Sequence, residues 1–150
     1  MNELNISPKA KGCCTPTAHN QKTNLEGEQD HLKELPVAIL GAGPVGLAAA
    51  AHLESRGESF FLLEAGNQVG ANILSWGHVR LFSPWRYNID KAASVILKKH
   101  DWNQPDLESL PTGNELVEQY LQPLSNLPEI QPFINLNTKV LSIGIFLVKP

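Results

Sequence analysis

The chain has 150 residues, 42% of them hydrophobic, and a net charge of −3, which permits one domain with a hydrophobic core. The composition lacks a polybasic signature, which argues against binding to nucleic acid or to a membrane surface. No apolar run approaches the ~18 residues that span a bilayer, and residues 1–10 lack the apolar block of a secretory signal. We therefore expect a cytoplasmic protein.

Residues 1–34 are predominantly polar, and we predict a flexible leader because its few apolar side chains cannot offset the cost of ordering the chain. The leader holds the only two cysteines, Cys13 and Cys14, which are adjacent. Adjacent thiols can capture a soft metal ion or an oxidant, but no further cysteine completes a zinc set and His19 alone adds too little. Two reduced, solvated thiols are the simpler interpretation, and capture of a thiophilic metal or metalloid is the alternative.

An unbroken apolar run at residues 36–40 is followed directly by three glycines. The run predicts a strand buried on both faces of a parallel sheet. The glycines, Gly41, Gly43 and Gly46, fill the pattern G-x-G-x-x-G. In this pattern the first allows a tight turn, the second lets the backbone approach a pyrophosphate, and the third lets a helix pack against the strand.

Residues 44–56 are rich in alanine and predict a helix that begins beside the phosphates, with its free N–H groups directed at them. Pro44 suits the first turn. Ala50 and Leu53 are spaced to face the sheet, and Gly57 follows as a C-terminal stop.

Residues 59–63 predict a second buried strand, with Glu64 at its end, 23 residues after Gly41. A carboxylate at this place can accept hydrogen bonds from a ribose diol, and it would repel the 2′-phosphate of NADP. Ala65, rather than an arginine, follows it. The combination predicts a dinucleotide site; the alternative is a glycine-turn packing unit without a ligand.

The stretch from Gly41 to Ala48, continued through Glu64, resembles the N-terminal FAD-binding motif of the FAD-dependent pyridine-nucleotide oxidoreductases, and more narrowly their flavin-containing monooxygenase-like branch. The resemblance implies FAD as cofactor and NAD(P)H as co-substrate. Because Cys13 and Cys14 precede this motif, they do not match the redox cysteines of the disulfide reductases.

In this family a glycine pair follows the acid, and here the pair is Gly70-Ala71, so the second glycine is replaced. The aromatic segment, residues 76–90, falls where the family builds its flavin and substrate wall. The resemblance places Asp90 near the flavin, although Asp90 equally suits a helix cap. Two interpretations of the segment stay open: contact with flavin or substrate, or aromatic rings (Trp76, Phe82 and Trp85) that pin a loop to the core.

Beyond Glu64 the elements are less regular. We predict a long loop over residues 65–88, a helix over 91–100, a proline-marked connection over 101–113, and a helix opened by a capping box from Thr112 to Glu115. Pro123 predicts that this last helix ends near residue 121 or 122.

Two strands are predicted near the end of the chain, at residues 133–137 and 139–143, the first as a third parallel strand. The resemblance brings a backbone amide near Val140 to the adenine. An ordinary strand residue is the equal alternative.

The predicted fold is α/β, a Rossmann-like parallel three-layer arrangement, with a leader at 1–34, the N-terminal part of an FAD/NAD(P)-binding domain at 35–143, and a tail at 144–150 unlike the family. The resemblance covers only the opening part of a usual member, so we expect a truncated FAD-dependent oxidoreductase or, alternatively, a non-catalytic dinucleotide-binding module. A partner chain could supply the missing half of the domain. The sequence identifies no catalytic residue and no metal ligands. The residues predicted to contact the dinucleotide are Gly41, Ala42, Gly43, Pro44, Val45, Gly46, Glu64, Ala65, Ala71, Asp90 and Val140.

Overall fold

The structure of the protein is a computed structural model that describes residues 35–144. The predicted leader, with Cys13 and Cys14, and residues 145–150 lie outside the described residues, so the predictions made for them stay predictions. Among the helices of the described part, none has the length and apolar character required to cross a membrane.

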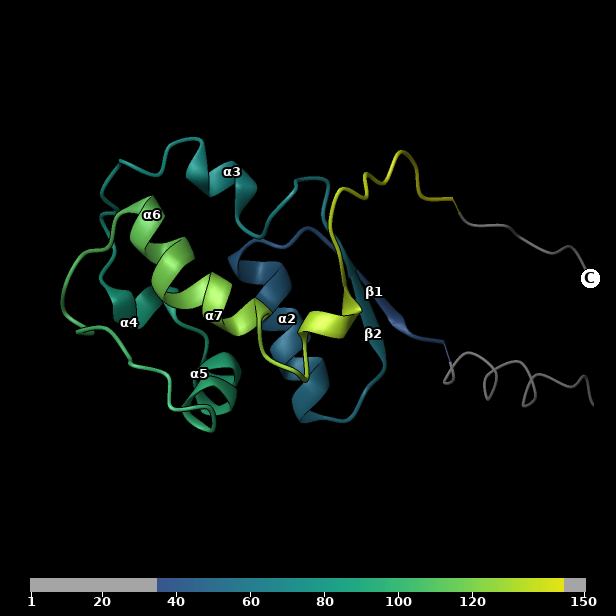
Figure 1. The fold of residues 1–150 in the computed structure, drawn as a ribbon, viewed down its shortest axis with the longest axis horizontal. Helices are drawn as coiled ribbons and strands as arrows, with labels where there is room; N and C mark the ends of the chain where they lie inside the picture. Colours follow the sequence, from purple (N-terminus) through teal and green to yellow (C-terminus); the bar gives the residue numbers. More distant parts are fainter. Residues whose placement is uncertain (1–34, 145–150) are drawn as a thin grey trace, which may run out of the picture. The chain divides into compact units, whose positions relative to one another are not determined.

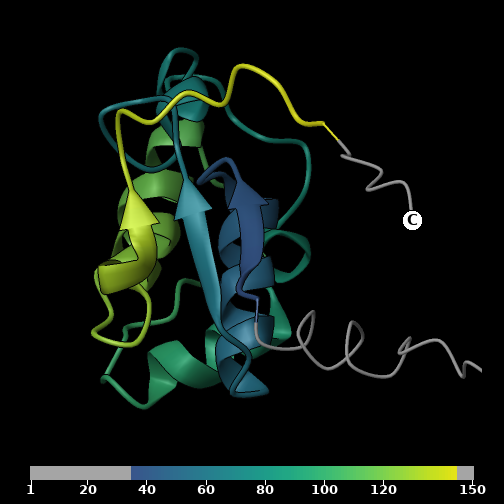
Figure 2. The same cartoon turned by 90° about the vertical axis from the view of Figure 1, so that its right-hand side faces the viewer.

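Three parallel strands form one sheet in the order β1-β2-β3. They are β1 (Val37–Leu40), β2 (Phe60–Leu63) and β3 (Ile134–Asn135). Figure 2 shows the three strands side by side, with their arrows pointing to the same end of the sheet. The predicted α/β class with a parallel sheet is confirmed, and the first of the two late strands is present, although it is only two residues long.

Helices cover one face of this sheet. In Figure 2 they all lie behind the strands, and Figure 1 shows the same sheet edge-on with the helices to its left. Within residues 35–144 the other face carries no helical layer, so the described part contains two of the three predicted layers. The helices are α2 (Pro44–Ser55), α3 (Ala71–Leu74), α4 (Trp85–Asn88), α5 (Lys91–Lys98), α6 (Gly113–Leu116), the π-helical η1 (Val117–Leu121), α7 (Gln122–Ser125) and the 3-10 turn η2 (Gln131–Phe133).

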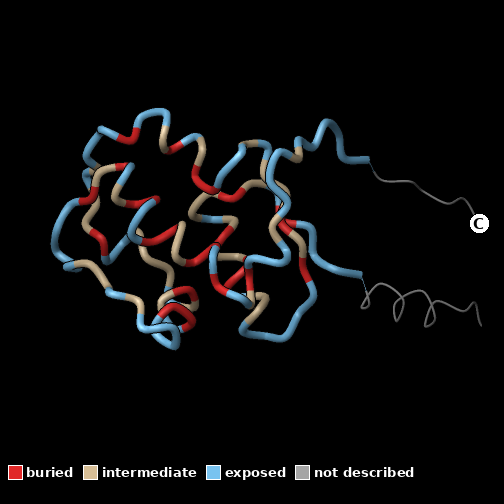
Figure 3. Tube along the Cα trace, in the orientation of Figure 1, coloured by how far each residue is buried: buried red, intermediate tan, exposed pale blue. Residues whose placement is uncertain are grey.

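The hydrophobic core lies between the sheet and these helices, where Figure 3 shows the buried positions. Leu62 from β2 meets Leu47 and Ala50 from α2, and Leu121 and Leu124 complete the cluster from η1 and α7. As predicted, Ala50 faces the core, and α2 stops before Gly57, whose φ of +68° favours glycine.

The prediction that β1 is buried on both faces is wrong for the described part of the chain. Ile39 is buried, but Leu40 is 48% exposed and Val37 is 45% exposed. The reason is position, because β1 lies at the margin of a sheet that helices cover on one face only. A continuous apolar run therefore reports how suitable a strand is for burial and not whether a covering layer exists.

The helix that opens with the Thr112–Glu115 capping box is longer than predicted. The capping box is present, but the helix passes through Pro123 and ends at Ser125. The π-helical turn η1 ends two residues before the proline and widens the backbone of the preceding turn, where the proline ring would otherwise strike a carbonyl. Burial of Leu124 in the core then stabilises the extra turn of the helix.

Two further predictions also differ from the structure. Residues 139–143 form no strand, and no strand of the described part of the chain pairs with them. Leu141 is accordingly 86% exposed. The predicted long loop at 65–88 contains two single-turn helices, α3 and α4.

Candidate functional site

The glycine turn between β1 and α2 has the shape that its sequence predicts. Gly41 has a φ of +97°, which strongly favours glycine. A Cβ atom at Gly46 would lie 1.9 Å from the carbonyl oxygen of Gly41, so no side chain fits there while helix and strand stay packed. These two glycines therefore define the turn.

Gly43 differs from the other two because the space around it is open. A Cβ atom at this position would meet nothing within 4 Å. Gly43 is the N-cap of α2, and Pro44 occupies the first turn, where its missing N–H costs nothing. Within the described residues the amides of Gly43, Val45 and Gly46 have no hydrogen-bond partner, as expected for the first turn of a helix.

Glu64 lies directly against this turn. Its Oε2 accepts a hydrogen bond from the amide of Ala42 at 2.6 Å, and its Oε1 accepts one from the amide of Gly66 at 2.7 Å. The Ala42 carbonyl in turn accepts from the amide of Gly70 at 2.9 Å. The acid and the glycine turn, 22 residues apart in the sequence, are therefore neighbours.

The turn after β3 reaches the same place from the other side of β2. The amide of Thr138 donates to the carbonyl of Glu64 at 2.7 Å, and the amide of Asn137 donates to the carbonyl of Gly66 at 2.8 Å. Val140, two residues further on, lies outside any strand, which rules out the alternative of an ordinary strand residue. Ala65 is exposed beside this turn.

The Gly70-Ala71 pair contacts both the glycine turn and the helices. Gly70 has a φ of +66°, and a Cβ atom there would lie 2.7 Å from Cγ2 of Val117. Ala71 begins α3 and carries its side chain at an intermediate level of exposure. Gly70, which packing requires to be glycine, is thus retained, whereas the position of Ala71 accommodates a methyl group.

Asp90 is the N-cap of α5, which confirms the capping alternative. Its Oδ1 accepts a hydrogen bond from the amide of Ala93 at 3.1 Å, and its Oδ2 lies 3.2 Å from Nε2 of His52 on α2. Burial raises the pKa of the Asp90 carboxyl, but the hydrogen bonds from Ala93 and His52 outweigh it, so that the net pKa is lowered. The amide of Asp90 donates to the hydroxyl of Tyr120 at 3.0 Å, and burial raises the pKa of Tyr120 to about 12.

A hollow of about 500 Å³ joins Asp90 to the start of α2. Pro44 and Val45 line one side of it, and Tyr87, Asp90 and Tyr120 line the other. The structure therefore brings the first turn of α2 and Asp90 to one cavity, although 45 residues separate Val45 from Asp90 in the sequence.

The aromatic segment is held to the core mainly by Trp85, which is 3% exposed. The ring of Trp76 lies against Gly113 but stays partly exposed. Phe82 is 98% exposed, so the prediction that it pins the segment to the core is wrong. Tyr87 is exposed as well, with the guanidinium of Arg86 4.9 Å from the centre of its ring.

Comparison with known families agrees with this geometry. The model of the NAD(P)-binding Rossmann-like domain family matches residues 39–109, from within β1 to the connection after α5. The match covers slightly less than half of the chain and describes what these residues are similar to. A search of curated proteins finds no match.

Solved structures share the fold of the Rossmann-like domain. OTEMO in complex with FAD and NADP has 21% identity and a TM-score of 0.52, covering 72% of this chain and 20% of its own. Oxidized steroid monooxygenase bound to NADP has 23% identity and a TM-score of 0.51, covering 67% and 19%. Bacillithiol disulfide reductase Bdr (YpdA) from Staphylococcus aureus has 22% identity and a TM-score of 0.51, covering 69% and 28%.

The chain thus spans about a fifth of the length of OTEMO and of the steroid monooxygenase. The family match and the fold of these neighbours agree with the predicted Rossmann-like fold.

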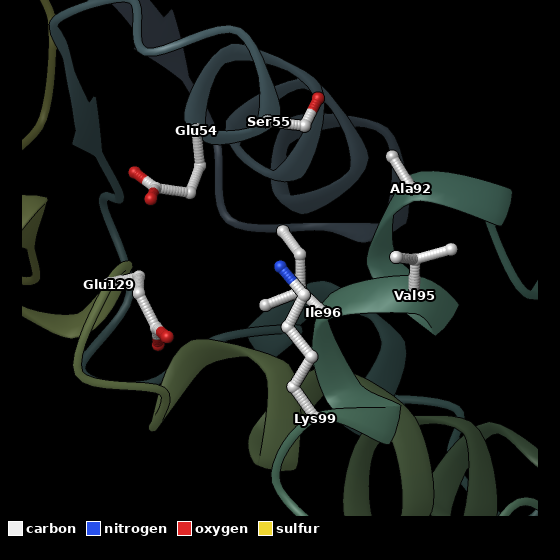
Figure 4. Close-up of a pocket in the computed structure, with 7 residues that line it drawn as sticks. All are labelled: Glu54, Ser55, Ala92, Val95, Ile96, Lys99 and Glu129. Carbon is white, nitrogen blue, oxygen red and sulfur yellow. The ribbon is translucent and has the colours of Figure 1, made fainter.

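The Rossmann-like domain has a second hollow, of about 390 Å³, at the opposite end of α2 (Figure 4). Glu54 and Ser55 lie at the end of α2, Ile96 and Lys99 come from α5 and the residue that caps it, and Glu129 faces them from the turn after α7. A hydrogen bond with His100 lowers the pKa of Glu129. The described residues contain no group of three or more His, Cys, Asp or Glu side chains suited to a metal ion.

His52 and Tyr120 are the site residues that sequence reasoning missed. Each contacts Asp90, from 38 and 30 residues away, and each lines the hollow beside α2. Neither lies in a recognisable motif, so only the packing of α2, α5 and η1 against one another reveals them.

Proposed function

We propose that residues 35–144 bind the ADP half of FAD, as part of an FAD-dependent, NAD(P)H-linked oxidoreductase of the monooxygenase-like type. One observation carries the proposal: the carboxylate of Glu64 lies 2.6 Å from the amide of Ala42, inside the glycine turn. A diphosphate held at the turn and a ribose held by the acid would then be adjacent, as they are in a dinucleotide.

The diphosphate fits the start of α2. The amides of Gly43, Val45 and Gly46 are free to donate to its oxygens, and the N-terminus of a 12-residue helix favours negative charge. The open space at Gly43 is where the backbone must come close to the phosphates. A side chain there would occupy the position of the ligand.

The ribose fits Glu64. Each carboxylate oxygen accepts one backbone hydrogen bond and keeps a further lone pair for a sugar hydroxyl. The two backbone bonds also fix the orientation of the carboxylate before the ligand arrives. The negative charge disfavours a 2′-phosphate in this site, which supports FAD or NAD over NADP as the occupant.

The turn at residues 137–140 supports a place for the adenine. It is tied to Glu64 by the bond from Thr138, which holds the backbone of Val140 near the ribose position. On the other side of the turn, the hollow between Pro44 and Asp90 is the place we assign to the flavin half. The flavin supplies the redox chemistry when it is bound, and the residues of this chain position it.

A non-catalytic dinucleotide-binding module is the second candidate. One fact favours it. The hydrogen-bonding groups of the site belong to the glycine turn, Glu64 and the turn at 137–140, and in our proposal all of them bind the ADP half of the cofactor. In this case we expect the purified full chain to hold little flavin. A yellow preparation with stoichiometric FAD that oxidises NAD(P)H would select the oxidoreductase instead.

Calorimetry with ADP-ribose tests the common part of both candidates. The full chain should bind ADP-ribose, and Glu64→Gln should weaken binding about tenfold or more through loss of a charged hydrogen-bond acceptor. Glu58→Gln is the matched control, because Glu58 is exposed just before β2, at the amino end of the strand. Equal affinities for the two variants, with circular dichroism showing both folded, would contradict the assignment of Glu64.

A further inference from the structure

Tyr120 is the most deeply buried residue on the wall of the hollow beside α2. It lies in the π-helical turn η1 and is 1% exposed. Turns of this kind are rare and occur frequently at functional sites. The hydroxyl oxygen of Tyr120 accepts a hydrogen bond from the amide of Asp90 at 3.0 Å, and Asp90 lines the same hollow. The hydroxyl is therefore held in a fixed position beside the hollow.

The hydroxyl proton of Tyr120 has no acceptor among the described residues. The bond from the Asp90 amide uses a lone pair of the oxygen, so the O–H group must point elsewhere, and no group within residues 35–144 accepts it. Burial raises the pKa of Tyr120 to about 12, so the hydroxyl keeps its proton at neutral pH. Nearly all buried donors in folded proteins have a partner. An acceptor that comes from the hollow would satisfy this one.

The other hydrogen-bonding side chains on this wall are paired within the chain or exposed. The carboxylate of Asp90 already pairs with a backbone amide and with His52. The side-chain amide of Asn88 forms three hydrogen bonds within the aromatic segment. Tyr87 and Lys91 are exposed. Of the buried polar groups that residues 35–144 contribute to this wall, the phenol proton is the one that stays uncommitted.

We propose that Tyr120 is a binding residue for the flavin half of the cofactor, donating its hydroxyl proton to an acceptor atom of that half. This role rests on the proposed function, which assigns the hollow to the flavin half. The hollow, of about 500 Å³, has the size of a small-molecule site and joins Tyr120 to the first turn of α2, where the diphosphate is proposed to lie. A flavin offers suitable acceptors in its oxygens and ring nitrogens. Tyr120 thus adds a contact for the flavin half to the groups that bind the ADP half.

Titration of the full chain with FAD and with ADP-ribose tests this role, because only FAD carries the flavin half. FAD should bind more tightly than ADP-ribose. Tyr120→Phe should weaken FAD binding about tenfold, through loss of one hydrogen bond, and should change the affinity for ADP-ribose by less than about twofold.

Ser125→Ala is the matched control. It also removes a buried hydroxyl from the helical stretch that contains Tyr120, but the proton of this hydroxyl is bonded to the carbonyl of Gln122 at 2.9 Å. Ser125 does not line the hollow beside α2. The variant should therefore leave the affinities for FAD and for ADP-ribose unchanged.

Carbon-13 NMR separates a direct bond to the flavin from an effect through Asp90, whose amide loses its acceptor in Tyr120→Phe. The chain has two tyrosines, so a sample labelled at tyrosine Cζ gives two resonances, and Tyr87→Phe assigns them. Because Cζ carries the hydroxyl, the Tyr120 resonance should shift when FAD is added. It should stay in place with ADP-ribose.

Four outcomes would overturn the role of Tyr120. Unchanged FAD affinity in Tyr120→Phe would leave the hydroxyl to an ordered water molecule. An equal loss for FAD and ADP-ribose would place the effect in the fold or the ADP half. A Tyr120 resonance that does not respond to FAD would exclude a direct bond, and FAD bound no more tightly than ADP-ribose would exclude the hollow. In all four cases ADP-ribose still binds, whereas its failure to bind the unsubstituted chain would reject the proposed function itself.

Discussion

Two regions beside the start of α2 are built in different ways. The glycine turn is held by backbone contacts, with Gly46 packed against the Gly41 carbonyl and Ala42 bonded to Glu64. The aromatic segment at 76–90 is held by the buried ring of Trp85, while Phe82 and Tyr87 point to solvent. The glycine turn therefore depends on close backbone packing, whereas the aromatic segment presents exposed side chains.

This difference separates stability from binding. In the turn, a substitution changes the path of the backbone, so it affects the fold or the space for a ligand. In the segment, an exposed ring makes few contacts within the chain, so its loss should leave the fold intact. Four predictions test this contrast.

The largest effect is expected for Gly46→Ala. The new Cβ atom would lie 1.9 Å from a backbone carbonyl, which cannot move without separating α2 from β1. We expect a loss of about 3 kcal/mol in the free energy of unfolding, measured by urea denaturation. Gly43→Ala is the control, since its Cβ atom meets nothing within 4 Å. Equal unfolding midpoints for the two variants would show that the close packing at Gly46 does not restrict this position to glycine.

Gly43→Val should act on binding alone. Its side chain would fill open space next to the free amides of α2, where the diphosphate is proposed to lie. We expect a loss of about a hundredfold in affinity for ADP-ribose, or ~2.7 kcal/mol, measured by calorimetry. The circular dichroism spectrum and melting temperature should stay close to those of the unsubstituted chain. Undiminished heat of binding would place the diphosphate elsewhere.

Asp90→Asn should have a smaller effect that depends on pH. Asparagine keeps the cap of α5 but loses the charge beside His52 and the helix N-terminus, which costs about 0.3–1 kcal/mol at neutral pH. Because the folded pKa of Asp90 is lowered, its contribution is present above the unfolded value of about 3.9 and is lost as pH falls through the folded value. Urea midpoints of the two proteins should therefore converge below that pH. A gap that persists in acid would mean that the charge is not its cause.

The smallest effect on stability is expected for Phe82→Ala. The ring is 98% exposed, so its removal should change the free energy of unfolding by less than about 0.5 kcal/mol. Thermal melting of the variant checks this value. A loss of several kcal/mol would show that the aromatic segment packs against the domain after all, and would remove the contrast between the two regions.

The unit from β1 to Glu64 was predictable because its contacts are close in the sequence. A strand, a tight turn and a helix that packs back on the strand form within about 30 residues, and each step has its own residue requirement. The positions of Gly41, Gly46, Gly57 and Glu64 in the structure follow these requirements. The capping box at Thr112 is local in the same way.

The later part was less predictable because its contacts are distant. Pro123 signalled a helix end, yet burial of Leu124 and a π-helical turn carry the helix past it. Residues 139–143 alternate like a strand, yet no strand within residues 35–144 pairs with them. In each case a local preference of about 1–3 kcal/mol yields to the packing or the pairing available at that place.

By itself, the sequence determined the dinucleotide-type turn and the acid that accompanies it, because glycine geometry and a carboxylate at a strand end act over short range. Only the tertiary structure decided which residues share the hollow with Asp90, and that within residues 35–144 β1 lies at the margin of the sheet with one face uncovered. These features depend on how whole helices and strands pack together, and no single segment of the chain encodes that packing.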